Sequence, residues 1–119
     1  MPHSPQDVYK KILGKKGEKL AENYLKKAGF TLLQRNYTTP FGEADLLMQK
    51  GEERVFVEVK TRTADGYGTP AESVTKEKRK KYEKIAMYYL SGQREELAVR
   101  FDVVEVWADG RIVHIENAF

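Results

Sequence analysis

The sequence contains no cysteine, which excludes disulfide bonds, thiolate zinc sites and a cysteine nucleophile. Histidine is nearly absent too, because only His3 near the start and His114 near the end occur. A histidine-based metal site is therefore not expected. Any bound metal would be held by oxygen ligands, which favours Mg²⁺ or Mn²⁺.

Long hydrophobic runs are also missing, and no apolar stretch approaches the roughly 20 residues of a transmembrane helix. The opening residues, MPHSPQDVYKK, lack the apolar core of a secretory signal. We find no internal repeat and no low-complexity tract. We therefore expect a cytoplasmic protein without a membrane partner, with a single domain over residues 1–119 and a disordered tail over residues 1–7.

What is present is a periodic pattern of an α/β protein. We expect a first helix from about Tyr9 or Lys15 to Lys27, ended by Gly29. The other expected elements are strands over 30–37, 43–49 and 54–62, a helix over 76–90, and strands over 99–108 and 111–116. This order, α-β-β-β-α-β-β, predicts a mixed five-stranded sheet flanked by helices.

The strand RVFVEVKTR, residues 54–62, carries an acid and a base within an apolar segment. Strand alternation places Val55, Val57 and Val59 on one face, which reads as core. The other face starts apolar at Phe56 and becomes charged at Glu58 and Lys60. If the turn QKGEER closes a hairpin, Asp45 of the preceding strand comes within a few residues of that charged pair.

Two carboxylates and an ammonium group at one place suit a defined chemistry. Asp45 and Glu58 could coordinate one divalent cation, and Lys60 could stabilise a hydroxide or the charge of a transition state. Glu18 borders the buried face of the first helix and could orient a water molecule or bind a second metal. The alternatives are a cross-strand ion pair at Glu58 and Lys60 and an ordinary helix carboxylate at Glu18.

Two further acids have open interpretations. Glu43 shares strand parity with Asp45 and could be another ligand, but a capping or ion-pairing role in the turn is the simpler expectation. Asp102, in RFDVVEV, is expected to be an inward-facing polar residue or a cap at a strand end, and not a metal ligand.

Positive charge is concentrated in two segments although the net charge is only +3. Residues 76–84, KEKRKKYEK, hold six of the 21 basic residues, and residues 10–19, KKILGKKGEK, hold five more. Such clusters can bind a nucleic-acid backbone. They can equally be the solvated faces of helices.

The combined motifs resemble the YraN family, small bacterial proteins with a PD-(D/E)xK-type restriction-endonuclease-like fold that are related to archaeal Holliday junction resolvases. The resemblance rests on a first-helix glutamate, GEADLL, VFVEVKTR, a Gly-Tyr-Gly loop and a basic helix, and it covers nearly the whole chain. Segments such as LLQRNY, RFDVVEV and IENAF also look like family segments. Ala44 stands where the motif name has proline, a substitution that leaves the metal chemistry intact.

The resemblance implies an Mg²⁺-dependent DNA endonuclease, with branched DNA as a candidate substrate. It further implies that Glu18, Asp45, Glu58 and Lys60 are the catalytic residues and that Asp45 and Glu58 are metal ligands. The alternative is a nucleic-acid-binding module of the same fold that cleaves little or not at all. Cutting a symmetric junction would require a homodimer with paired sites. The residues expected to contact nucleic acid are Lys76, Lys78, Arg79 and Lys80 at the start of the second helix, and Tyr67, which could stack on an unpaired base or simply hold its loop to the domain.

Overall fold

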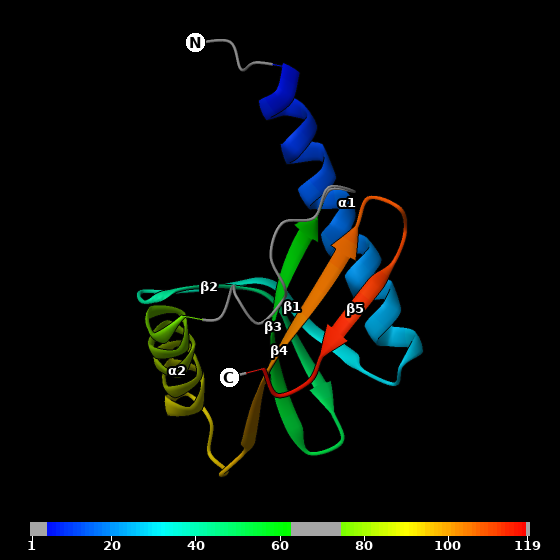
Figure 1. The fold of residues 1–119 in the computed structure, drawn as a ribbon. Coiled ribbons are helices and arrows are strands. Elements are labelled where there is room, and N and C mark those ends of the chain that lie inside the picture. Colours follow the sequence, from blue (N-terminus) through cyan, green and yellow to red (C-terminus); the bar gives the residue numbers. More distant parts are fainter. Residues whose placement is uncertain (1–4, 63–74, 119) are drawn as a thin grey trace.

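The computed structural model describes residues 5–62 and 75–118, with side chains described from residue 15 onward. Its elements run in the predicted order (Figure 1). They are α1 (Pro5–Lys27), β1 (Thr31–Thr39), β2 (Gly42–Lys50), β3 (Glu53–Arg62), α2 (Lys76–Ser91), β4 (Ala98–Trp107) and β5 (Ile112–Ile115). No helix in these two ranges is long and apolar enough to cross a membrane.

Helix α1 begins at Pro5, earlier than the expected start at Tyr9 or Lys15, and ends as predicted at Lys27. Proline is favoured at the first helical position, where its missing N–H leaves no hydrogen bond unmade. The chain leaves the helix through Gly29, whose φ of 95° favours glycine. Residues 1–4 of the predicted tail lie outside the described residues.

The sheet is mixed, with strand order β1-β2-β3-β4-β5. The predicted hairpin between β2 and β3 is confirmed, since Lys50 pairs with Glu53 and Leu46 pairs with Val57. Only β3 and β4 are parallel, with Glu53 opposite Ala98 and Arg62 opposite Trp107. Two parallel neighbouring strands need a crossover connection between the end of one and the start of the next. Helix α2, which lies between β3 and β4 in the sequence, forms part of this connection.

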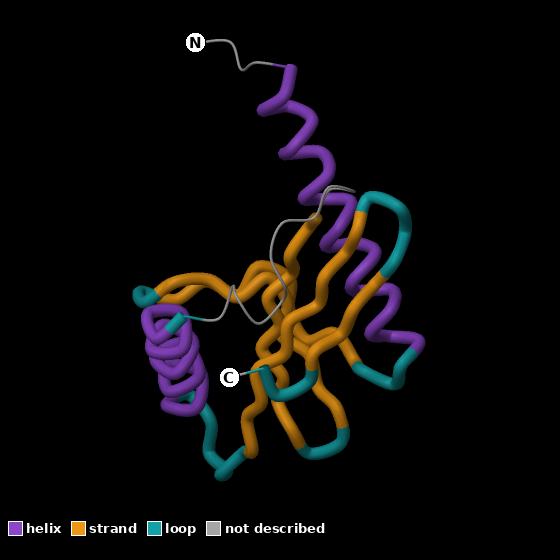
Figure 2. The backbone as a smooth tube through the Cα atoms, viewed as in Figure 1, coloured by secondary structure: helices purple, strands orange, loops and turns teal. Residues whose placement is uncertain are grey.

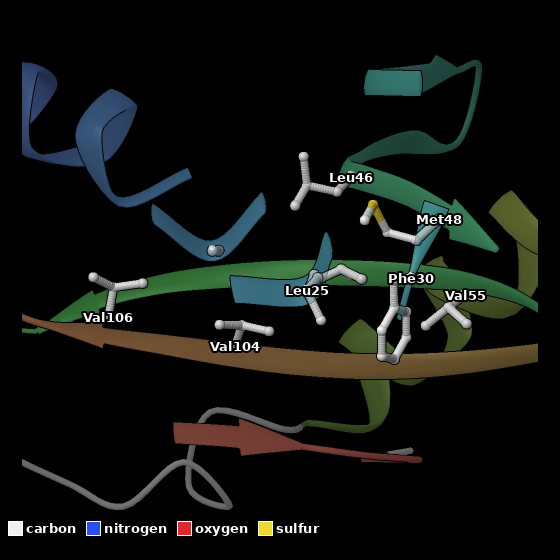
Figure 3. Packing of buried hydrophobic residues seen from close by; sticks show 9 residues of the cluster. Leu25, Phe30, Leu46, Met48, Val55, Val104 and Val106 are labelled. Atoms are coloured by element: carbon white, nitrogen blue, oxygen red, sulfur yellow. The ribbon is translucent and has the colours of Figure 1, made fainter. Parts of the chain in front are cut away.

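Both faces of the sheet are covered, and the strand alternation predicted for β3 is confirmed. Val55 and Val57 pack with Ala21 and Leu25 of α1. Figure 3 shows the centre of this cluster between α1 and the sheet. Phe56 packs on the other face in a cluster that includes three α2 residues, Tyr82, Ile85 and Ala86.

The first residues of β2 do not pair with β3. Its pairing with β3 covers only Leu46–Lys50, whereas its pairing with β1 continues to the turn, where Thr39 lies opposite Gly42. The free part of the β1–β2 hairpin therefore leaves the sheet. Figure 2 shows it curving across to α2. The point of separation, at Asp45, opens the sheet beside the charged end of β3.

Close contact between α1 and β3 depends on Gly17. A Cβ atom at this position would clash with Cγ2 of Thr61 and approach Val106. We expect Gly17→Ala to lower the free energy of unfolding by about 1–2 kcal/mol in urea denaturation, because overpacking outweighs the better helix propensity of alanine. Thr61→Ser removes the clashing methyl group and should restore most of that loss in the double variant. A Gly17→Ala protein more stable than wild type would contradict this packing.

Candidate functional site

Asp45 lies where β2 and β3 part. Its Oδ2 atom accepts a hydrogen bond of 2.7 Å from the backbone N–H of Val59. The carboxylate thus replaces the strand partner that β3 loses at this level, and the hydrogen bond holds it beside the backbone that joins Glu58 to Lys60. The predicted proximity of Asp45 to this segment is confirmed.

Glu58 is buried, with 8% of its surface exposed, and its two carboxylate oxygens have different surroundings. Oε1 lies 3.1 Å from Nζ of Lys60 and 2.8 Å from Nζ of Lys78. Oε2 is buried and has no hydrogen-bond partner among the described residues. A buried carboxylate oxygen without a partner is costly in free energy unless a cation or donor completes the site.

Two of the acids, Asp45 and Glu18, have raised pKa values. Burial raises the pKa of Asp45, and the negative charges of Glu58 and Glu43 raise it further, although the Val59 N–H and Lys60 oppose the shift. Burial also raises the pKa of Glu18, to which the charges of Asp45 and Glu43 add. The structure therefore brings Glu18 of α1 within electrostatic range of Asp45, one of the two predicted metal ligands, and of Glu43. A proton or a cation would relieve this repulsion.

Two lysines face Glu58. Burial lowers the pKa of Lys78, and repulsion from Lys60 also lowers it, although the contact with Glu58 opposes both. Burial works in the same sense on Lys60, but its contact with Glu58 raises the pKa above the ordinary value. The Glu58 carboxylate therefore favours the protonated form of both neighbouring lysines.

Tyr82 of α2 is buried within electrostatic range of these acids. Burial raises the pKa of its phenol, and the charges of Glu58, Asp45 and Glu43 raise it further. The phenol therefore stays neutral beside the acid cluster.

The donor set fits a hard divalent cation, as judged by the unpartnered Oε2 of Glu58 beside Asp45. These two carboxylates supply oxygen ligands, which Mg²⁺ and Mn²⁺ prefer. Within the described ranges, no three His, Asp or Glu side chains converge tightly enough to enclose a metal by themselves. An Mg²⁺ ion held here would keep several positions for water or phosphate, as is usual for this ion.

The predicted nucleic-acid contacts separate into two groups. Lys76, Arg79 and Lys80 are exposed at the start of α2. Lys78 is partly buried and contacts Glu58. Tyr67 lies outside the described residues. Glu43 is exposed and accepts a hydrogen bond of 3.4 Å from the hydroxyl of Thr38 across the hairpin, which agrees with the simpler role expected for it.

Lys78 was missed as a member of the acid cluster because it stands in a run of exposed basic residues. One signal could have identified it. Lys78 precedes Tyr82 by four residues and Ile85 by seven, so it lies on the same side of the helix as the buried stripe. The N-cap at Thr75, whose side chain accepts a hydrogen bond from the Lys78 N–H, fixes this first turn.

One turn after Glu18, Glu22 anchors α1 to β1. Glu22 is almost fully buried and accepts hydrogen bonds of 2.6 and 2.9 Å from Nε and Nη2 of Arg35. Lys26 adds an ion pair of 2.8 Å. The hydrogen bonds from Arg35 lower the pKa of Glu22 to about 2, against the opposing effect of burial. This anchor fixes the helix that carries Glu18.

We expect Glu22→Gln to lower stability in a pH-dependent manner. The folded-state pKa is depressed, so the charge of Glu22 stabilises the fold above the ordinary glutamate pKa, and this contribution is lost as the pH falls towards 2. Urea denaturation near neutral pH should show a free energy of unfolding that is lower by about 1–2 kcal/mol, because the variant loses hydrogen bonds between charged groups. The loss is not larger because Arg35 is half exposed and solvent weakens the ion pair. The difference from wild type should shrink between about pH 5 and pH 2. A difference independent of pH would contradict the ion pair, and the exposed Glu83→Gln serves as control.

Another buried acid, Asp102, lies on β4. Asp102 has no exposed surface, and its two oxygens accept hydrogen bonds from Arg100, from the His114 ring at 2.7 Å and from the backbone N–H of Asn117. Burial favours the protonated form, but these hydrogen bonds hold the pKa of Asp102 below its ordinary value. Asp102 is thus an inward-facing polar residue with a full set of partners, and it is not part of the site around Asp45.

Comparison with known proteins identifies relatives along most of the chain. The chain is 48% identical to a UPF0102 protein of Thermodesulfovibrio yellowstonii over 107 residues, which cover 90% of this chain and 95% of the relative. It is 45% identical to a UPF0102 protein of Desulfosudis oleivorans, with 89% and 88% covered, and 40% identical to one of Caldanaerobacter subterraneus, with 94% and 98% covered. The profile described as "Uncharacterised protein family UPF0102" matches residues 17–106, which include Glu18, Asp45, Glu58, Lys60 and Lys78. The chain therefore belongs to this family, UPF0102, the YraN family that its motifs resemble.

Proposed function

We propose that this protein is a metal-dependent DNA endonuclease that hydrolyses phosphodiester bonds at the site formed by Asp45, Glu58 and Lys60. The observation that carries the proposal is the buried Oε2 of Glu58, which has no hydrogen-bond partner in the described parts of the chain and lies in a cluster of mutually repelling acids. The ion pairs of Glu58 with Lys60 and Lys78 use only Oε1, and Oε2 is left for a cation.

In this proposal Asp45 and Glu58 would hold Mg²⁺ or Mn²⁺. When bound, the ion supplies Lewis-acid polarisation of the phosphate and lowers the pKa of water. Lys60, held beside the acids by its ion pair with Glu58, stabilises the negative charge that grows on the phosphate as water attacks phosphorus and one P–O ester bond breaks. Lys78 partly neutralises Glu58 through Oε1, which leaves Oε2 as the more available oxygen.

Glu18 has a separate role in this proposal. Its raised pKa and its position near Asp45 and Glu43 suit a carboxylate that accepts a proton from the attacking water or orients it. Helix α1 would thus contribute to the chemistry from the side opposite α2. The exposed Lys76, Arg79 and Lys80 would add non-specific affinity for the DNA backbone.

The test is a cleavage assay on duplex, single-stranded and four-way-junction DNA, with Mg²⁺ or Mn²⁺ titrated from zero. We expect cleavage that requires the cation and that stops with EDTA, together with a rise of the melting temperature on metal addition. Metal binding without cleavage would instead favour the nucleic-acid-binding module of the same fold. If the acids bind no metal, the nuclease proposal fails. Branched DNA as the preferred substrate would also predict a homodimer, which sedimentation can detect.

A further inference from the structure

The tip of the β1–β2 hairpin meets α2 at an exposed aromatic pair. The rings of Phe41, in the turn, and Tyr88, on α2, lie with centroids 6.4 Å apart at an interplanar angle of 71°. Phe41 is 49% exposed and Tyr88 is 45% exposed. Large aromatic side chains that remain this exposed next to each other are available for a ligand.

A row of lysines runs along α2 beside this pair. Lys78, Lys81 and Lys84 follow one another at intervals of three residues, and Tyr88 comes four residues later, so all four share one side of the helix. Nζ of Lys84 lies 5.9 Å from the centroid of the Phe41 ring. Glu77 lies four residues before Lys81 and therefore on the same side of α2. One acid among three lysines leaves this side of the helix with a net positive charge.

The hairpin and the helix are in close contact along this row. A Cβ atom at Gly42 would lie only 3.0 Å from Cδ of Lys81, so the turn rests on the stem of that lysine. Figure 1 shows the hairpin reaching across to α2, apart from the rest of the sheet. We use the name aromatic seam for the surface formed by Phe41, Lys81, Lys84 and Tyr88.

The aromatic seam is continuous with the acid cluster. At its inner end Lys78 contacts Glu58, and strand β2 runs from Gly42 directly to Asp45. Phe41 precedes Asp45 by four residues, which corresponds to about 13 Å along an extended strand. A chain of phosphates at the acids would therefore pass the lysines before it reaches the aromatic rings.

We propose that the aromatic seam binds single-stranded DNA next to the bond that is cut, with Lys81 and Lys84 on its phosphates and an unpaired base stacked on Phe41 and Tyr88. This inference rests on the proposed nuclease function and specifies its substrate class as DNA with unpaired nucleotides beside the scissile phosphate. In a duplex the faces of the bases are covered by stacking, whereas an unpaired base exposes a face to an aromatic side chain. Alternating cations and aromatic rings are the features by which proteins hold single strands without sequence preference.

The positive charge of the aromatic seam favours single-stranded DNA over a second copy of the chain as its binding partner. The two lysines of the aromatic seam, Lys81 and Lys84, favour a polyanion. Two copies that met through this surface would bring their lysines together, and this repulsion would oppose association.

The test measures binding in EDTA, so that no strand is cut. The probes are a fluorescein-labelled oligothymidylate of about 12 nucleotides, the same strand with one 2-aminopurine, and a duplex of equal length. Wild type should bind the single strand and quench 2-aminopurine through stacking. Phe41→Leu keeps an apolar side chain but removes the aromatic face, and we expect about 5- to 30-fold weaker single-strand binding and loss of the quenching. Duplex binding should change less.

Three further variants sharpen the result. Tyr88→Leu should behave as Phe41→Leu does. Lys84→Gln should weaken binding and reduce the slope of log K against log salt by about 0.7, as expected for one phosphate contact on a single strand. Val113→Ala changes an exposed apolar residue of β5 and should leave binding unaltered.

Several outcomes would overturn the aromatic seam as a DNA site. They are single-strand binding by Phe41→Leu equal to that of wild type, no single-strand binding by wild type, and a wild-type dimer in sedimentation that Phe41→Leu dissociates. Because the assay contains no metal, its result is independent of cleavage. A protein that binds single strands through Phe41 but never cuts would refute the nuclease proposal alone. Cleavage of unpaired DNA without dependence on Phe41 would refute this inference alone.

Discussion

Replacing Asp45 by asparagine is expected to lower metal-dependent DNA cleavage by about 10²- to 10³-fold or more while the protein stays folded. The asparagine side-chain oxygen can still accept the hydrogen bond from the Val59 N–H, which the carboxylate accepts at 2.7 Å. What disappears is the negative charge that would attract the cation. The rate should be measured on the best substrate of wild type at saturating Mg²⁺, together with the metal-induced rise in melting temperature, which should also vanish.

The control for this experiment is Asp109→Asn, which alters an exposed carboxylate in the turn after β4 and should leave cleavage unchanged. In EDTA the melting temperature of Asp45→Asn should equal or exceed that of wild type, because the variant removes repulsion among Asp45, Glu58 and Glu43. Cleavage within a few fold of wild type would exclude Asp45 as a metal ligand. A large loss of stability in EDTA would instead indicate that the carboxylate is structural.

Replacing Asp102 by alanine should cause the largest loss of stability among single substitutions of charged residues discussed for this protein. The variant leaves His114 without its carboxylate and Arg100 with only the longer contact of 3.4 Å to Glu53, although the Arg100 and His114 side chains are only 14% and 6% exposed. It also removes the acceptor for the Asn117 N–H. Breaking a buried ion pair by deleting one partner costs about 3–5 kcal/mol, which urea denaturation should show.

Asp109→Ala is the matched control for Asp102→Ala. Asp109 pairs with Arg111 at 2.8 Å, a distance close to those around Asp102. In contrast to the Asp102 cluster, the side chains of Asp109 and Arg111 are both well exposed. Solvent weakens such a pair, so we expect a loss of about 0–1 kcal/mol. If the two variants lost equal stability, burial would not be what makes the Asp102 cluster important.

Much of this fold could be predicted from the sequence because its signals are local. Alternation in β3 separates Val55 and Val57 from Phe56, and the structure places them in different core clusters. The turn at Gly51 sets the β2–β3 register and thereby brings Asp45 to the level of Glu58. These features depend on residues near one another in the chain, so strand geometry alone predicts them.

The contributions of the helices to the site could not be predicted in the same way. Whether Lys78 reaches Glu58 depends on the position at which the crossover places α2, and many core contacts determine that position together. The hydrogen bonds of Asp102 likewise join β4 to β5 and to the C-terminal segment, and the type of each residue does not reveal these pairings. The departure of β2 from β3 is a property of the twisted sheet, which hydrophobic alternation does not encode.

The position of the parallel strand pair has a consequence for the order in which the site can form during synthesis. Glu18, Asp45, Glu58 and Lys60 all belong to α1, β2 and β3, whose strand pairings are antiparallel and close in sequence. The parallel pairing of β3 with β4 is long-range and must wait until α2 has been made. A nascent chain can therefore gather all of these acids before Lys78 is available to balance Glu58. The partly folded domain would carry an acid cluster whose negative charge attracts cations. Docking of α2 would then offset part of that charge through the ion pair between Lys78 and Glu58.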